Sequence, residues 1–139
     1  MEDRYLFKAK RIDNGEWVEG FPFLVNDVSY ILPYHNTGQP IHIDNLLSTS
    51  VEASKATICQ CTGLKDKNGR LIWENGICDR KEEYPEIVKY NNGDWILDYS
   101  YSKGKESGYC YCNLGFYALE RKCVEVIGNI FDNPELLEV

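Results

Sequence analysis

The sequence lacks any apolar run long enough to cross a membrane. A spanning helix needs about 20 consecutive apolar residues, and no stretch of the 139 residues approaches that length. The first residues, Met1-Glu2-Asp3-Arg4, also lack the charged-then-apolar layout of a secretory signal peptide. We therefore expect a protein that has no membrane partner and stays in the cytoplasm.

Basic residues are scarce. There are 15 Lys and Arg against 22 Asp and Glu, which gives a net charge of −7, and residues 12–54 contain no basic residue at all. A surface that binds nucleic acid through its phosphates needs Lys and Arg in excess, so we do not expect nucleic acid as a partner. One basic group, Lys65, Lys67 and Arg70, is either a solvated turn or a small tip that binds an acidic partner.

The common catalytic motifs are missing. The chain has no phosphate-binding Gly-x4-Gly-Lys-Ser/Thr, no dinucleotide-binding Gly-x-Gly-x2-Gly after a strand, no His-Glu-x2-His and no Gly-x-Ser-x-Gly. Its two histidines, His35 and His42, fall in or beside a loop at residues 33–40. We predict a non-enzymatic protein with no catalytic residue and no cofactor, and keep a hydrolase that uses His35 or His42 with carboxylates as an alternative.

Six cysteines in a reducing cytoplasm are thiols or metal ligands rather than disulfides. The two Cys-x-Cys pairs, Cys59 with Cys61 and Cys110 with Cys112, do not have the spacing of a zinc knuckle. Residues i and i+2 share a face of a strand, so two adjacent strands could still offer four sulfurs to zinc. We favour the interpretation that these are small buried apolar side chains, and predict no metal site.

Short alternating runs separated by Asn-Gly, Asp-Asn-Gly and Gly-Asp turns predict a mainly β, antiparallel protein. We predict one domain over residues 1–139, with hairpins in 1–32, a small SH3-like barrel in 58–126 and a C-terminal arm in 127–139. Asn133-Pro134 predicts a short terminal helix, residues 54–57 at most one helical turn, and residues 102–108 a mobile loop. The predicted hairpins are 5–10 with 16–21, 23–25 with 28–32, 60–64 with 70–73 and 86–90 with 95–101; further strands are 41–43, 77–78, 109–112, 116–119 and 123–130.

Aromatic residues are abundant, with ten Tyr and three Trp. Most alternate with Leu, Ile and Val, as core residues of strands do. Four lie beside polar or turn residues and could instead stack bases; they are Tyr99, Tyr101, Tyr109 and Tyr111. A β-barrel that binds single-stranded nucleic acid is therefore the second alternative function.

Three segments of the sequence resemble the YopX family of phage and prophage proteins. Residues 59–74, CQCTGLKDKNGRLIWE, are similar to the family hallmark Gly-Gln-Tyr-Thr-Gly-Leu-Lys-Asp-Lys-Asn-Gly-Lys-x-Ile-Tyr/Phe-Glu. Residues 17–20, Trp-Val-Glu-Gly, and residues 125–137, which contain Glu-Val-Ile-Gly-Asn-Ile-Phe-Asp-Asn-Pro-Glu-Leu-Leu, match two further blocks. The resemblance spans essentially the whole chain.

Departures from the family pattern weaken the metal-site alternative. Cys61 stands where the family usually has Tyr, Cys59 where it often has Gly, and Cys78 where it has Val. The resemblance implies a phage-encoded protein in the cytoplasm of a bacterial host, a homo-oligomer, with no known reaction or cofactor. The hallmark itself is typical of a hairpin in which Gly69 takes a positive φ, so we expect its role to be structural.

These observations predict a phage accessory protein that assembles with itself and binds a host or phage protein. Short strands leave edges that assembly could cover. Apolar side chains also gather near the C-terminus, where a small domain often has no core left to bury them. We predict that these form the oligomer contact: Ile127, Ile130, Phe131, Leu136 and Leu137.

Overall fold

The computed structural model describes residues 3–34, 45–103 and 111–138 of the chain. His35, His42, Tyr109 and Cys110 lie outside the described residues, as do the predicted strand 41–43 and most of the predicted loop 102–108. The described residues divide into two compact units, Met1–Gln60 and Cys61–Val139, called below the N-terminal and C-terminal units. The single domain predicted for 1–139 stays a prediction.

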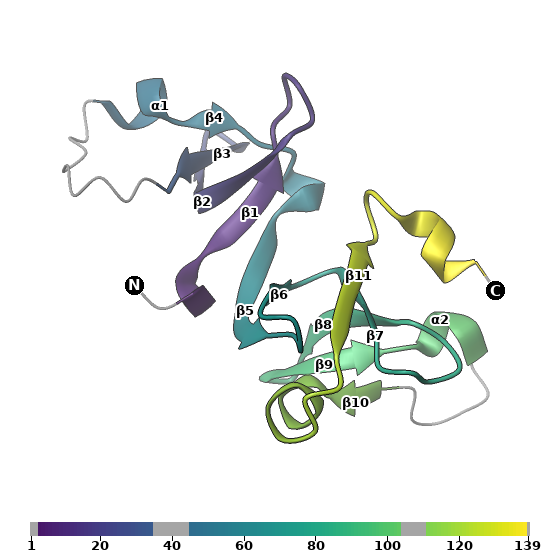
Figure 1. Cartoon of the computed structure of the whole chain (residues 1–139). Coiled ribbons are helices and arrows are strands. Elements are labelled where there is room, and N and C mark those ends of the chain that lie inside the picture. The colour runs from purple at the N-terminus through teal and green to yellow at the C-terminus, as the bar shows by residue number, and fades with distance from the viewer. Residues whose placement is uncertain (1–2, 35–44, 104–110, 139) are drawn as a thin grey trace. The chain divides into compact units, whose positions relative to one another are not determined.

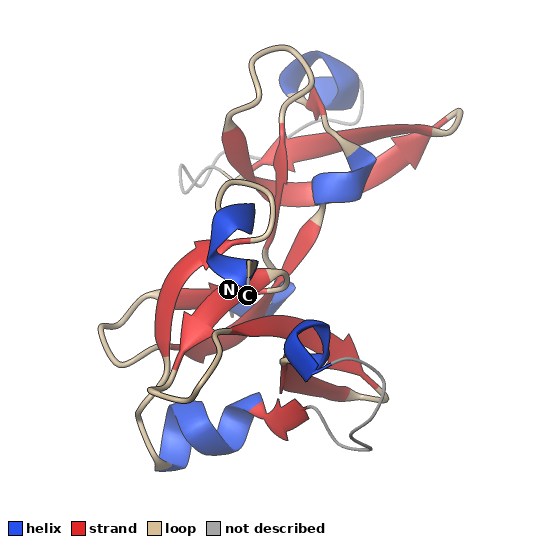
Figure 2. Cartoon of the chain, turned by 90° about the vertical axis from the view of Figure 1, so that its right-hand side faces the viewer, coloured by secondary structure: helices blue, strands red, loops and turns tan. Residues whose placement is uncertain are grey.

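Strands dominate both units and the helical segments are short (Figure 2), which confirms the mainly antiparallel β prediction. In the N-terminal unit the sheet order is β4-β3-β2-β1-β5 (Figure 1). Its elements are η1 (Asp3–Tyr5), β1 (Phe7–Lys10), β2 (Trp17–Val25), β3 (Val28–Pro33), α1 (Leu46–Thr49), β4 (Val51–Glu52), η3 (Lys55–Thr57) and the start of β5 (Cys59–Lys65).

Both predicted hairpins of the N-terminal unit form. Asn26 and Asp27 connect β2 to β3 with φ of 49° and 65°, the left-handed conformations that a tight two-residue turn requires. Gly20 of β2 has no room for a side chain, because an added Cβ would collide with the Leu32 carbonyl. The small core of this unit is built from Ala9, Ile31 and Ala53, with Val18, Val51 and Ile58 packed against them.

In the C-terminal unit β5 continues into a hairpin with β6, and a second sheet has the order β10-β9-β8-β7-β11. Its elements are β6 (Leu71–Trp73), β7 (Gly76–Asp79), β8 (Glu86–Asn91), β9 (Asp94–Asp98), α2 (Ser100–Lys103), β10 (Tyr111–Asn113), the π-helical turn η5 (Phe116–Glu120), β11 (Glu125–Asn129) and η6 (Pro134–Leu137). The core consists of Ile72, Cys78, Val88, Leu97, Leu114, Ala118 and Val124.

Three of the six cysteines, Cys59, Cys61 and Cys78, are buried, which confirms the packing interpretation for them. Burial raises the pKa of Cys78 to about 12, with smaller contributions from nearby carboxylates, so this thiol stays protonated. Within the ranges that the structure describes, no group of three or more His, Cys, Asp or Glu could hold a metal ion.

Several predicted elements are wrong for a local reason. The strand expected to reach Tyr101 ends at Asp98, whose carboxylate accepts the Ser100 amide at 2.8 Å. The strand expected at 116–119 is instead η5, and the Asn113 side chain accepts the Phe116 amide at 2.8 Å. Such side-chain bonds to the backbone begin helical turns and override a weak alternation of apolar residues. The helices α1 and α2 were not expected, and α2 takes in the first two residues of the predicted loop 102–108.

Two predicted helical turns are confirmed. The single helical turn expected at 54–57 is η3, and the short terminal helix is η6, a 3-10 turn with Pro134 at its start. The SH3-like barrel is not confirmed, since the described strands of the second sheet end at edge strands β10 and β11. No helix among the described residues is long and apolar enough to span a membrane.

Candidate functional site

The charged loop, residues 65–70, is organised around the buried carboxylate of Asp66, which is 6% exposed. Its Oδ1 accepts the amides of Asn68 and Arg70, both at 2.9 Å, and its Oδ2 accepts the amide of Val126 at 2.9 Å. Burial alone would raise the pKa of this carboxyl, but the three backbone donors lower it below its ordinary value. Asp66 therefore holds the loop as an ionised acceptor.

The charged loop also covers the outer edge of β11. The Lys67 amide donates to the Val124 carbonyl at 2.9 Å, and the Arg70 guanidinium donates to the Val126 carbonyl at 3.4 Å. Gly69, with φ of 83°, makes the turn as predicted. An exposed strand edge can pair with the strand of another chain, and the charged loop blocks such pairing along this part of β11.

The three predicted partner-binding residues differ in their contacts. Lys67 forms an ion pair with Glu125 at 3.3 Å, and Arg70 is directed to β11 as described, whereas Lys65 is exposed. Two of the three cations thus have partners within the chain. A partner-binding role for Lys65, Lys67 and Arg70 stays a prediction.

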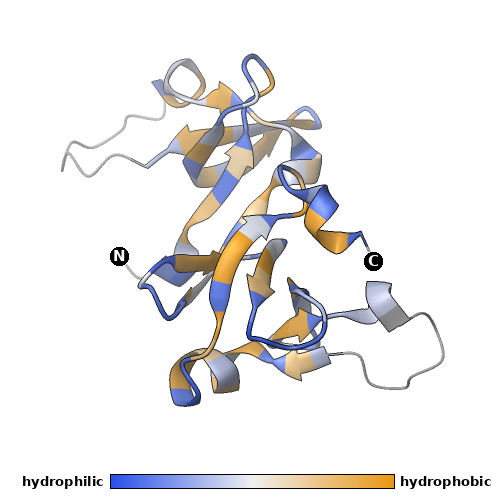
Figure 3. Ribbon diagram, turned by 45° about the vertical axis from the view of Figure 1, so that its right-hand side comes forward, coloured by the Kyte–Doolittle hydropathy of each residue, from blue (hydrophilic) through white to orange (hydrophobic). Residues whose placement is uncertain are grey.

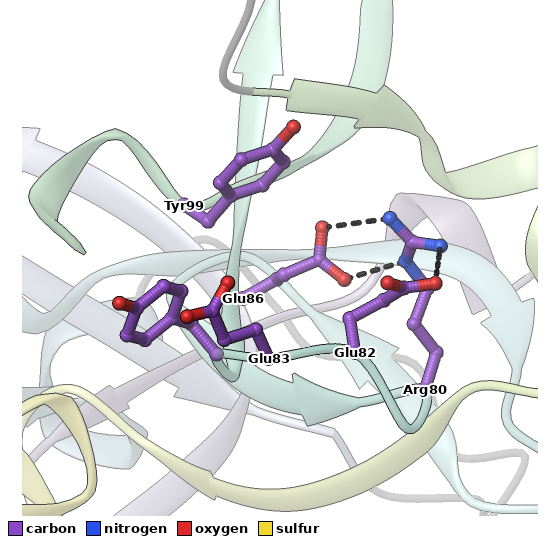
Figure 4. A pocket seen from close by; sticks show the side chains of 6 residues that line it. Arg80, Glu82, Glu83, Glu86 and Tyr99 are labelled. Carbon is purple, nitrogen blue, oxygen red and sulfur yellow. Dashed lines mark hydrogen bonds and ion pairs between the residues drawn. The ribbon is translucent and has the colours of Figure 1, made fainter. Parts of the chain in front are cut away.

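A second cluster lines a half-open cavity of about 110 Å³ between the end of β7, the start of β8 and the residue that follows β9 (Figure 4). It is called the acidic pocket below. It is lined by Arg80, Glu82, Glu83, Tyr84, Glu86 and Tyr99.

Arg80 and Glu86 form the buried floor of the acidic pocket. Their side chains are 10% and 2% exposed, and the Arg80 Nε donates to Glu86 Oε1 at 2.6 Å while Nη2 donates to Oε2 at 3.4 Å. The Arg80 Nη1 binds Glu82 at 3.1 Å and its Nη2 the Cys112 sulfur at 3.2 Å. Its guanidinium carbon also lies 4.2 Å from the centre of the Tyr117 ring. Arg80 is therefore fully engaged by the fold.

Burial sets the acid–base properties of this floor. It raises the pKa of Glu86 above the ordinary value despite the opposing effect of Arg80. The pKa of the neighbouring Tyr101 hydroxyl is raised by burial and by the charge of Glu86, and burial likewise raises the pKa of Cys112 against the influence of Arg80. A thiol with a raised pKa is a poor nucleophile, so this cluster does not have the features of a cysteine enzyme.

Residues 7–138 match the family model described as YopX protein. The chain belongs to the YopX family. Its structure is similar to the crystal structure of protein EF1440 from Enterococcus faecalis, with a TM-score of 0.56 and 27% sequence identity over 95% of this chain and 96% of that chain. No curated protein matches the chain. None of these comparisons indicates a specific activity.

The charged loop is the central part of the hallmark by which the chain resembles YopX proteins, and the structure gives its residues structural partners. Thr62 of the same block is buried and donates to the Ile72 carbonyl at 2.7 Å. Gly63 follows with φ of 80° where the register of β5 and β6 shifts. These contacts support the expectation that the YopX hallmark specifies shape.

The C-terminal arm was predicted over residues 127–139, and its described part, 127–138, is more firmly placed than its position near the terminus suggested. Ile127 lies within β11, where its neighbours pair with β7, and the Ile130 amide donates to the Asn75 carbonyl at 3.1 Å. Gly128 is packed against the Asn133 side chain, which would lie 2.5 Å from an added Cβ. The arm is thus docked through β11, and only the residues after Asn129 extend beyond the sheet.

The acidic pocket was missed at the sequence level. Its residues come from the charged run 79–86, Asp-Arg-Lys-Glu-Glu-Tyr-Pro-Glu, and from Tyr99. The one available signal was an apolar-poor run with an arginine six residues before a glutamate that begins a strand. Of the four tyrosines singled out for stacking, Tyr99 lines the pocket, Tyr101 donates to the Pro85 carbonyl at 2.7 Å and Tyr111 is exposed.

Proposed function

We propose that this YopX protein is a non-enzymatic accessory protein, encoded by a phage or prophage, that assembles with itself and binds another protein in the cytoplasm of a bacterial host. The observation that carries the proposal is the state of the C-terminal arm. Its apolar side chains are held in place and yet incompletely covered.

The arm presents five apolar side chains without burying any of them fully. Ile127 is 39% exposed, and Ile130, Phe131, Leu136 and Leu137 are half-buried. The turn η6 contains no buried residue, and it carries both hydrophobic and hydrophilic residues (Figure 3). An apolar surface fixed to a folded unit, rather than frayed, can bury area against a second copy at little ordering cost.

Light scattering tests self-assembly. The full chain is expected to elute as an oligomer, and the double variant Leu136→Ser, Leu137→Ser as a smaller species with an unchanged circular dichroism spectrum. The matched control is Glu135→Gln in the same turn, which is exposed and is expected to keep the mass of the full chain. A monomeric full chain, or a folded serine variant of unchanged mass, would contradict the proposal.

A second candidate function, binding of single-stranded nucleic acid, is favoured by one face of the N-terminal unit rather than by the tyrosines first considered. The ammonium groups of Lys8 and Lys10 lie 4.6 and 5.5 Å from the Trp17 ring centre. Phe23 and Tyr30, paired across β2 and β3, stack with centroids 5.6 Å apart. Aromatic rings and lysines on one sheet face are the elements of a base-stacking platform.

Fluorescence anisotropy with a labelled oligothymidine tests this candidate. Binding that falls steeply with salt and is reduced in Phe23→Ala, but not in an alanine variant of the exposed Leu24 on the opposite face, would support it. Absence of binding at low salt would contradict it. The alternative hydrolase depends on His35 and His42, which lie outside the described residues, and it stays a prediction.

A further inference from the structure

The acidic pocket has a ligand preference that can be derived from how its charges are used. Among the residues that the structure describes, Arg80 is the one basic residue that lines it, and all of the guanidinium's contacts described above are with groups of the same unit. An anionic ligand would have to displace Glu86 from Arg80 and leave that carboxylate buried without its cation. Such an uncompensated buried charge is strongly unfavourable, so the pocket is not built for anions.

The charge that remains at the mouth of the pocket is negative. The Glu82 side chain is 57% exposed and uses one oxygen for Arg80, and Glu83 is exposed. In Figure 4 the dashed lines join Arg80 to Glu86 and Glu82. The Glu83 carboxylate raises the pKa of the Tyr84 hydroxyl through its charge and through a side-chain hydrogen bond, so Glu83 is held at the mouth and keeps its negative charge. Glu82 and Glu83 thus place two carboxylates beside a cavity whose own cation is already compensated.

The walls of the cavity are suited to an organic cation. Tyr84 and Tyr99 contribute two aromatic rings to the lining, and ammonium and guanidinium groups bind to the faces of such rings. The volume of about 110 Å³ has room for the head of a long basic side chain. A hollow with two tyrosines and a buried ion-pair floor differs from a solvated group of acidic residues.

We propose that the acidic pocket binds the cationic head of an arginine or lysine side chain presented by a partner protein. The proposal rests on the protein-binding part of the proposed function and names the chemistry of the partner. Glu83 supplies the main charge, Tyr84 and Tyr99 the apolar walls, and Arg80 with Glu86 the rigid floor. Self-assembly through the C-terminal arm does not depend on it.

An NMR titration of the full chain with Nα-acetyl-arginine amide tests the proposal, because this probe carries the side chain without a partner protein. Saturable amide shifts are expected at residues 80–86 and 99. Nα-acetyl-citrulline amide has the same shape without the charge and is expected to bind at least about fivefold more weakly, since a cation–π and ion-pair contribution of this kind corresponds to such a factor.

Two variants separate charge from shape. Glu83→Gln is expected to weaken arginine binding by about fivefold and Tyr84→Ala by a similar factor. Glu138→Gln, which removes the same charge from an exposed position outside the lining, is expected to bind like the full chain. Because Glu83 and Tyr84 are not core residues, both variants should keep the fold, and their amide spectra verify this.

Equal binding of citrulline, shifts confined to other residues, unchanged binding by a folded Glu83→Gln protein, or preferential binding of inorganic phosphate would each overturn the proposal. The result is separable from that for self-assembly. If the chain is monomeric and binds the arginine probe, the pocket proposal stands and the self-assembly proposal fails. If the chain is an oligomer and does not bind the probe, self-assembly stands and the pocket proposal fails.

Discussion

Two buried carboxylates in the C-terminal unit, Asp66 in the charged loop and Glu86 in the acidic pocket, have opposite fates. Asp66 is 6% exposed and has a lowered pKa, and Glu86 is 1% exposed and has a raised one. Three backbone amides surround Asp66, whereas Glu86 depends on one guanidinium, Arg80. In Glu86, which has one cationic partner, the effect of burial on the pKa is larger than that of the partner. In Asp66, which accepts three backbone amides, the hydrogen bonds together have the larger effect on the pKa.

The comparison distinguishes a structural acid from one at a candidate binding site. The amides that bind Asp66 belong to its own loop and to the adjacent strand, and they occupy both carboxylate oxygens. Asp66 also borders a hollow of about 250 Å³ lined by Lys67, Ala118, Leu119 and Lys122. Glu86 and Arg80 form the floor of a cavity. Arg80 also forms an ion pair with Glu82, whose exposed carboxylate lies at the mouth of that cavity. A perturbed ionisable group beside a cavity indicates a candidate site, and of these two acids it is Glu86 whose cavity is also lined by exposed carboxylates, Glu82 and Glu83.

Removing the cation from Glu86 should have the largest effect. Arg80→Ala is expected to lower the free energy of unfolding by about 3–5 kcal/mol at pH 7, because a buried carboxylate loses its partner. Urea denaturation measures the loss, and it should shrink at acidic pH as Glu86 takes up a proton. The control is Arg121→Ala, an exposed arginine for which we expect less than about 1 kcal/mol.

Replacing both partners sharpens this result. Arg80→Met combined with Glu86→Leu should recover most of the lost stability, as apolar replacements of buried ion pairs often do. If the double variant were no more stable than Arg80→Ala, the ion pair itself would not account for the loss.

Asp66→Ala should have the next largest effect. It leaves the amides of Asn68, Arg70 and Val126 without their acceptor, at a cost of about 3 kcal/mol in unfolding free energy. Hydrogen exchange should accelerate at the Val126 amide in particular, since this bond joins the charged loop to β11. Rapid exchange at Val126 in the unmodified chain would show that its bond to Asp66, and with it the contact between the charged loop and β11, is not stable.

The pH dependence of stability should differ in sign between the two acids. Because the pKa of Asp66 is lowered from 3.8, its stabilising contribution is present above that pH and is lost as the pH falls through the folded-state pKa. Because the pKa of Glu86 is raised from 4.5, its charging destabilises the fold as the pH rises from that value through the folded-state pKa.

Chemical denaturation between pH 2 and 7 of the full chain, Asp66→Asn and Glu86→Gln checks these signs. The stability advantage of the full chain over Asp66→Asn should decline toward low pH. Its advantage over Glu86→Gln should decline toward high pH. Two differences of the same sign would break the comparison between the acids.

The ion pair at the surface of the charged loop should matter least. Lys67→Ala is expected to cost about 0.5 kcal/mol, because both side chains of the Lys67 and Glu125 pair are about one-third exposed, and added salt should reduce this cost further. Lys65→Ala, in the same loop, serves as the control and should change thermal stability less than Lys67→Ala. A larger effect of Lys65 would give that residue a structural contact not described above.

Short-range chemistry made much of the fold predictable. The turns at Asn26-Asp27 and Gly69 specify their own φ angles, so the hairpins they close were correctly predicted. Cys61 and Cys78 were correctly predicted as packing residues because a free cysteine most often behaves as a small buried apolar side chain. The segments at 99–101 and 116–119 were wrongly predicted because one side-chain acceptor, Asp98 or Asn113, redirects the backbone locally.

The sequence by itself determined the family, through a resemblance that spans the chain, and it determined the antiparallel β character and the turn positions, which depend on neighbours a few residues apart. Only the tertiary structure decided the rest. It paired Asp66 with Val126 and placed Arg80 against Cys112 and Tyr117, contacts between residues 32 to 60 positions apart. Burial and charge compensation are properties of such distant neighbours, and for that reason the acidic pocket could not be predicted from the run of residues that forms most of it.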